Sequence, residues 1–157
     1  MNKNIFIAFL LIVILTLFVA MFWGPDKVEA PLPDEETVAV VAQVEYSNAT
    51  SDNIVVDLPK PGDLIQSPVT VTGRARGTWY FEASFPIMVL DSNGNVIGQG
   101  PAQAIGEWMT EDFVPFSTEI VFTGNPTGNG FLLIKNDNPS GLPQFDKSIK
   151  IPVTFSQ

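Results

Sequence analysis

The stretch that decides the fold runs from Trp79 to Asp91 and reads WYFEASFPIMVLD. Apolar residues occupy every second position along it, which is the pattern of a β-strand with one buried face. The alternating set is Trp79, Phe81, Ala83, Phe85, Ile87 and Val89. Asn93-Gly94 follows directly, and such a pair supplies the positive φ angles of a tight hairpin turn. The stretch therefore predicts a strand that leads into a β-hairpin.

The second face of this predicted strand is mixed. Tyr80, Glu82 and Ser84 are expected to point away from the core near one end. Pro86 lacks a backbone N–H and cannot donate to a neighbouring strand, so it predicts a bend, a bulge or a sheet edge at that point.

Short strand-like runs separated by turn signals recur from Asn53 to the C-terminus, without a helical period of comparable length. The predicted strands are residues 54–58, 69–73, 79–90, 96–105, 114–122, 131–136 and 149–155. Two of them have clean apolar faces, made of Val114, Phe116, Thr118, Ile120 and Phe122, and of Ile149, Ile151, Val153 and Phe155. About seven antiparallel strands favour an all-β, immunoglobulin-like β-sandwich, with an open barrel as the second choice.

Composition narrows the chemistry that the chain can perform. The 157 residues suit one domain plus an appendage. The chain has no Cys and no His, which removes thiolate chemistry, His-based triads and most zinc sites. With 17 acidic and 8 basic residues the net charge is −9, which opposes binding to nucleic acid.

The N-terminal region predicts a membrane anchor. Residues 5–23 are apolar except for Thr16, and a helix of this length spans a bilayer of about 30 Å. Lys3 precedes the run, so the N-terminus is expected in the cytoplasm and the rest of the chain outside it. The alternative is a signal peptide that is cleaved, which would leave a secreted protein.

Three segments follow from these patterns. Residues 1–23 are the predicted signal anchor or transmembrane helix, and residues 24–52 are an acidic linker that contains prolines. Within this linker, residues 37–46 are apolar enough for a short strand or a helical turn. Residues 53–157 form the predicted immunoglobulin-like domain.

A series of motifs in this domain resembles a known family. The motifs are Pro61-Gly62, Ser67-Pro68-Val69, Gly77-Thr78-Trp79-Tyr80, Gly106-Glu107-Trp108-Met109, Phe113-Val114-Pro115-Phe116, Gly128-Asn129-Gly130, Asn138-Pro139-Ser140-Gly141 and Ile151-Pro152-Val153. In this order they resemble the bacterial immunoglobulin-like domain associated with spore-germination proteins. The resemblance covers residues 53–157 and implies an immunoglobulin-like fold without a catalytic role. It also implies binding in the cell envelope and a link to spore germination or cell-wall processes.

Aromatic and acidic residues form the first candidate site. Tyr80 and Trp108, with Trp79 and Met109, predict a platform on which a sugar ring could stack, and Glu82 would add a carboxylate. The competing interpretation is that Trp79 and Phe81 belong to the core. Glu82 is also expected to pair with Arg74 or Arg76 across two strands. A glycan hydrolase would instead use Glu82 with Glu107, Glu111 or Asp112 as its two carboxylates.

Two oxygen-rich turns are the remaining candidates. Asn138 and Ser140 belong to a turn that offers hydrogen-bonding groups to a ligand, or oxygen atoms to a cation. Asp91, Asn93 and Asn95 have the alternate spacing of a calcium loop, but Val96 and Ala102 occupy positions where an EF-hand has Gly and Glu. A hairpin turn explains them, so no metal and no cofactor are predicted.

The sequence therefore predicts a single-pass protein of the cell membrane with an extracytoplasmic domain. Its expected function is non-catalytic binding of a protein or a glycan of the cell envelope. The predicted binding residues are Tyr80, Glu82, Trp108, Asn138 and Ser140. The alternative function is a carboxylate-dependent glycan hydrolase.

Overall fold

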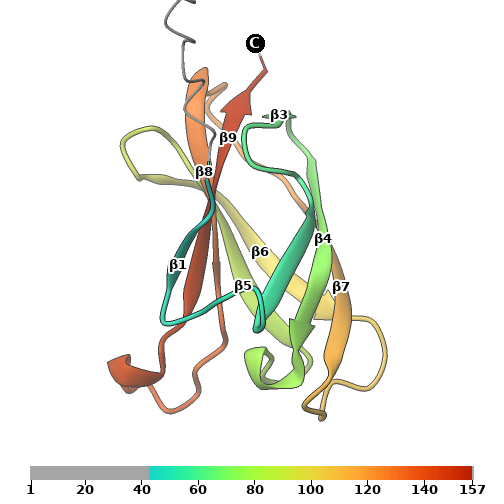
Figure 1. Cartoon of the computed structure of the whole chain (residues 1–157). Coiled ribbons are helices and arrows are strands. Elements are labelled where there is room, and N and C mark those ends of the chain that lie inside the picture. The colour runs from blue at the N-terminus through green and yellow to red at the C-terminus, as the bar shows by residue number, and fades with distance from the viewer. Residues whose placement is uncertain (1–42, 157) are drawn as a thin grey trace, which may run out of the picture. The chain divides into compact units, whose positions relative to one another are not determined.

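The computed structural model describes residues 43–156. Within this range the chain forms nine strands (Figure 1). They are β1 (Glu45–Ser47), β2 (Ile54–Leu58), β3 (Leu64–Ile65), β4 (Val69–Arg76), β5 (Ser84–Leu90), β6 (Val96–Ala104), β7 (Phe113–Ile120), β8 (Gly128–Lys135) and β9 (Ser148–Phe155). Two 3-10 turns, η1 (Gly77–Trp79) and η2 (Pro143–Phe145), interrupt them. None of these described residues belongs to a helix long and apolar enough to span a membrane. The predicted anchor and the linker up to residue 42 lie outside the described residues.

The strands are arranged in two facing layers (Figure 1). Hydrogen bonding follows the order β1-β9-β8-β5-β6-β7-β4-β2, and β3 joins the edge of β9. Only the β3–β9 pair is parallel; the other strand pairs are antiparallel. β6 connects the layers, because it pairs with β5 along most of its length and with β7 only at Gln103 and Ala104. The predicted all-β antiparallel architecture is confirmed.

Alternating side chains fill the space between the layers. β9 buries Ile149, Ile151, Val153 and Phe155, and β7 with the residues after it buries Val114, Phe116, Ile120 and Phe122. Both apolar faces that the sequence predicts are thus in the core. Each large apolar side chain that is removed from water contributes about 1.5–3 kcal/mol. Because the chain has no disulfide, this core is what holds the layers together.

The first half of the Trp79–Asp91 stretch is not a strand. Trp79 closes η1, and Phe81 and Ser84 exchange two backbone hydrogen bonds of 3.0 and 3.1 Å around a turn. Glu82 and Ala83 have φ angles of 49° and 62°, in the left-handed region that a strand excludes. Phe81 is 40 % exposed, so its expected place in the core is wrong. The strand begins only at Ser84.

Two short strands add to the seven that the sequence predicts. β1 and β3 both pair with β9, β1 near the start of β9 and β3 at its end. β1 overlaps the end of residues 37–46, for which the sequence allows a short strand or a helical turn, and residues 37–42 lie outside the described residues. β3 has two residues, too few to show a period-two pattern. β1 lies inside the segment interpreted as linker, and the sheet therefore begins before Asn53.

The predicted hairpin joins β5 to β6. Oδ1 of Asp91 accepts hydrogen bonds of 2.9 Å from the backbone N–H groups of Asn93 and Asn95. Gly94 has a φ angle of 83° and is the residue of this turn that takes the left-handed region. The Asn95 side chain and the turn N–H groups lower the pKa of the Asp91 carboxyl group. Both carboxylate oxygens of Asp91 are therefore engaged in holding the turn.

Candidate functional site

Three loops meet at one end of the sandwich, which is the lower end in Figure 1. They are residues 77–83 between β4 and β5, residues 105–112 between β6 and β7, and residues 136–147 between β8 and β9. Trp79 O accepts a hydrogen bond of 3.0 Å from Asp137 N, which ties the first loop to the third. This loop end contains the five residues predicted to bind: Tyr80, Glu82, Trp108, Asn138 and Ser140.

The first two loops pack backbone against backbone at Gly77. A Cβ atom at this position would collide with the carbonyl oxygens of Trp108 and Thr110. The N–H of Gly77 donates a 3.2 Å hydrogen bond to Asp112 O. On the other side, Ala104 N donates to Ala83 O at 2.9 Å. The two loops therefore form one continuous surface.

Arg76 fastens this surface to the β1–β2 connection. Its Nε donates to Asp52 O at 3.0 Å, and one terminal nitrogen donates to Glu111 O at 3.2 Å. The guanidinium carbon lies 4.2 Å from the ring centre of Phe113, a cation–π distance. The guanidinium group of Arg76 therefore has partners within the domain, namely two backbone carbonyl groups and one aromatic ring.

The ion pair predicted for Glu82 is wrong. Arg74 pairs with Asp57 on β2 at 3.4 Å, and both side chains are about half exposed. Arg76 binds backbone carbonyl groups instead of a carboxylate. The reason is the turn at residues 81–84, which removes Glu82 from the strand that would have faced β4.

Tyr80 supports the loop end from within. It is buried, whereas the sequence places it on the outer face of a strand. Its hydroxyl donates a 2.8 Å hydrogen bond to Val114 O, and its ring centre lies 5.0 Å from that of Phe85. Burial raises the pKa of Tyr80 to about 12. A buried ring cannot stack against a ligand, so the sugar platform loses this member.

Apolar side chains other than Tyr80 are exposed at the loop end. Trp108 is half-buried and packs against the core, while its neighbour Met109 is 78 % exposed. Ile105 is 58 % exposed and begins the same loop. The sequence analysis named Met109 only as part of the platform and missed Ile105. The available signal was two apolar residues in an acidic loop between strands.

Four carboxylates belong to the first two loops at this end of the domain. Glu82, Glu107, Glu111 and Asp112 are all exposed, in the two loops that meet at Gly77. They are the residues that the hydrolase alternative requires. A glycosidase acid usually lies in an apolar pocket that raises its pKa. Here the four groups lie in solvent.

The turn at Asn138 is held by its own side chains. Nδ2 of Asn138 donates to Leu142 O at 3.0 Å and to Asp146 Oδ1 at 2.8 Å. Its Oδ1 accepts a 2.6 Å hydrogen bond from the Ser140 hydroxyl, which in turn accepts from Leu142 N. Within residues 43–156, no three Asp, Glu, His or Cys side chains are grouped so as to hold a metal ion. Asn138 and Ser140 therefore shape the loop end.

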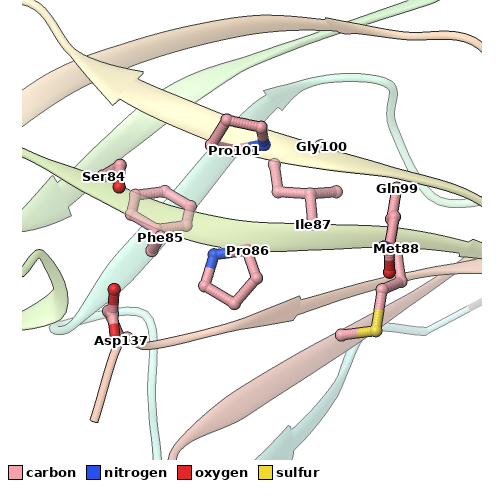
Figure 2. A pocket seen from close by; sticks show the side chains of 9 residues that line it. All are labelled: Ser84, Phe85, Pro86, Ile87, Met88, Gln99, Gly100, Pro101 and Asp137. Atoms are coloured by element: carbon pink, nitrogen blue, oxygen red, sulfur yellow. The ribbon is translucent and has the colours of Figure 1, made fainter. Parts of the chain in front are cut away.

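A shallow hollow of about 510 Å³ lies on the outer face of β5 and β6 (Figure 2). Pro86 faces Pro101 in the β5–β6 register, and β8 pairs with β5 only from Ile87 onward. β5 is an inner strand, so Pro86 does not lie on an edge strand; it lies where the β5–β8 ladder has ended. Figure 2 shows Pro86 and Met88 on this hollow, with Asp137 beyond the Pro86 end. The sequence did not reveal the hollow, because it depends on which residues face each other across strands.

Comparison with protein families matches residues 53–142 to the immunoglobulin-like domain of bacterial spore germination. The match spans more than half of the chain and extends from β2 to the turn that precedes η2. No curated protein and no solved structure matches the chain.

Proposed function

The chain belongs to the family of immunoglobulin-like domains of bacterial spore germination, and we propose from this membership that it is a non-catalytic binding module of the cell envelope. In this proposal residues 1–23 anchor it in the cytoplasmic membrane and the domain is extracytoplasmic. The loop end is its binding surface. A role beside the germination machinery or the cell wall is consistent with the family.

The observation that carries the proposal is the direction of the chain at the loop end. β1 is antiparallel to β9, with Glu45 opposite Lys150 and Ser47 opposite Ser148. The chain therefore enters the sheet while running toward the loop end. The N-terminal side of β1 therefore does not lie at the loop end of the domain. Recognition loops at the far end of a rigid sandwich are a common arrangement in binding domains.

The anchor is supported by the sequence alone. The apolar run from Ile5 to Trp23 is long enough for a bilayer of about 30 Å, and Lys3 on its N-terminal side favours a cytoplasmic start. Protease added to intact cells without their outer layer should remove the domain and spare a cytoplasmic marker. If domain and marker are protected equally, the proposed orientation is wrong.

The function is tested by binding to purified envelope material. The full chain, held in a neutral detergent, is incubated with cell-wall glycan and separately with solubilised envelope proteins. We expect retention by one of them, and weaker retention for Met109→Ser. Val121→Ser is the matched control, because Val121 is 66 % exposed and follows β7 at the opposite end. Equal loss in both variants would contradict a binding role for the loop end.

The hydrolase alternative has its own readout. Wall glycan is incubated with the chain, and soluble sugar fragments are measured. We expect no release. If fragments appear, and if Glu82→Gln or Glu107→Gln abolishes their release without lowering the melting temperature, then the chain is an enzyme and the non-catalytic proposal fails.

A further inference from the structure

The two loops that meet at Gly77 carry exposed apolar residues and exposed carboxylates, which together we call the acidic apolar surface. Its members are Phe81, Glu82, Ile105, Glu107, Met109 and Glu111. The backbone on both sides of Met109 lies over Gly77, and Ala83 is hydrogen-bonded to Ala104 next to Ile105. The apolar members therefore come from segments that touch each other.

The apolar members of this surface are exposed to solvent and are not part of the core. Met109 is 78 % exposed, Ile105 58 % and Phe81 40 %. Methionine and aromatic residues are enriched where proteins bind other proteins, and the flexible Met side chain adapts to different apolar surfaces. The neighbouring Trp108 is half-buried and packs against the core, which attaches this loop to the domain. Large apolar side chains exposed on touching segments are typical of an interaction surface.

Charge indicates which partner fits. Residues 77–83 and 105–112 contain four carboxylates and no Lys or Arg. The nearest cation, Arg76, already binds two backbone carbonyl groups and the Phe113 ring. The two loops therefore carry negative charge together with exposed apolar side chains. This surface repels anionic lipid headgroups and anionic polymers, and it attracts cations.

From these observations we propose that the acidic apolar surface docks a cationic protein segment, in which an apolar side chain is flanked by Lys or Arg. The apolar side chain contacts Met109 and Ile105, and the flanking cations lie beside Glu107 and Glu111. This inference rests on the proposed binding function and names the class of partner. A neutral glycan would use the apolar residues without needing the carboxylates.

The test uses the full chain in a neutral detergent and a displayed library of random twelve-residue peptides. We expect the selected peptides to be rich in Lys and Arg around an apolar residue. Their affinity should fall about fivefold or more with Met109→Ser, as for a central contact residue. It should also fall when Glu107 and Glu111 are both changed to Gln, and less so at high salt. Glu119→Gln, near the C-terminal end of β7, and Val121→Ser, just after β7, are the matched controls, because both residues are exposed and far from the loop end.

The outcomes separate this inference from the proposed function. Peptides that are acidic or without charge bias, or that bind Met109→Ser as well as the unchanged chain, overturn the inference. If the chain binds wall glycan and the variant with both Glu107→Gln and Glu111→Gln binds it equally, the proposed binding function stands. The inference of a cationic partner is then wrong. If neither peptides nor envelope material bind, both proposals fail.

Discussion

The hydroxyl group of Tyr80 donates a 2.8 Å hydrogen bond to the backbone carbonyl of Val114, a residue 34 positions away on β7. This contact joins the residue after η1 to β7 inside the core. Loss of one buried hydrogen bond that leaves its acceptor without a partner costs about 1–3 kcal/mol. We expect Tyr80→Phe to lower the free energy of unfolding by about that amount, measured by urea titration at pH 7.

The same residue predicts how stability depends on pH. The pKa of Tyr80 rises to about 12 in the folded protein from 10.0 in an exposed tyrosine. The raised pKa adds on the order of 2–3 kcal/mol to the free energy of unfolding. This contribution is fully present below pH 10 and is lost as the pH rises from 10 to 12. Between pH 9 and pH 11.5, urea titration should show that the free energy of unfolding falls less for Tyr80→Phe than for the unchanged chain. Equal falls would mean that Tyr80 is not the group responsible.

Gly77 is expected to tolerate no side chain. Its Cβ would meet two backbone oxygens of the neighbouring loop, and backbone atoms cannot move aside as a flexible side chain does. Gly77→Ala should lower the free energy of unfolding by about 1–3 kcal/mol, because the two loops must separate. Gly100→Ala is the control, since its Cβ would come no nearer than 3.7 Å to Ile120. Thermal melting that shifts equally in both variants would contradict the packing at Gly77.

The turn at Asn138 should be independent of metal. Its side-chain oxygen accepts hydrogen bonds from Ser140, and its nitrogen donates to Leu142 O and Asp146. We expect chelator and added calcium to leave the melting temperature unchanged. Asn138→Ala should lower stability by about 1 kcal/mol with or without calcium. A rise in melting temperature on adding calcium that this substitution abolishes would show that the turn is a cation site.

Trp79 has a buried indole Nε1 without a hydrogen-bond partner among residues 43–156. Its ring nevertheless fills the core and meets Phe85 edge to face at 6.4 Å. Trp79→Ala should therefore cost about 3–5 kcal/mol. Trp79→Phe removes the unsatisfied donor, which offsets about 1–3 kcal/mol of the lost packing. Equal losses in the two variants, measured by urea titration, would mean that the indole nitrogen has a partner in solution.

The loop end shows where local patterns stop being sufficient. Tyr80 and Phe81 have the spacing of a strand, yet the chain turns at Glu82 and Ala83, which take positive φ angles. This turn exchanges the two sides, burying Tyr80 and exposing Phe81. The turn is stabilised by hydrogen bonds and by packing against distant loops, so alternation of residue types does not reveal it.

Arg74 gives a second example. The sequence pairs it with Glu82 because both lie in predicted neighbouring strands. Its partner is Asp57, since β2 and not β5 lies beside β4. Which strands are neighbours is a property of the whole sheet.

The sequence by itself determined that the chain is an all-β domain, which faces of β7 and β9 are buried, and where the β5–β6 hairpin turns. These features are local, because side-chain alternation and turn geometry depend on a few consecutive residues. Only the tertiary structure decided that residues 77–83 and 105–112 form one surface with exposed Met109 and buried Tyr80. Tertiary contacts in this domain join positions that are far apart in the sequence; the hydrogen bond from Asn48 to Asp146, for example, spans 98 residues. They are set by strand order and register, which arise when the apolar faces of all strands are buried together.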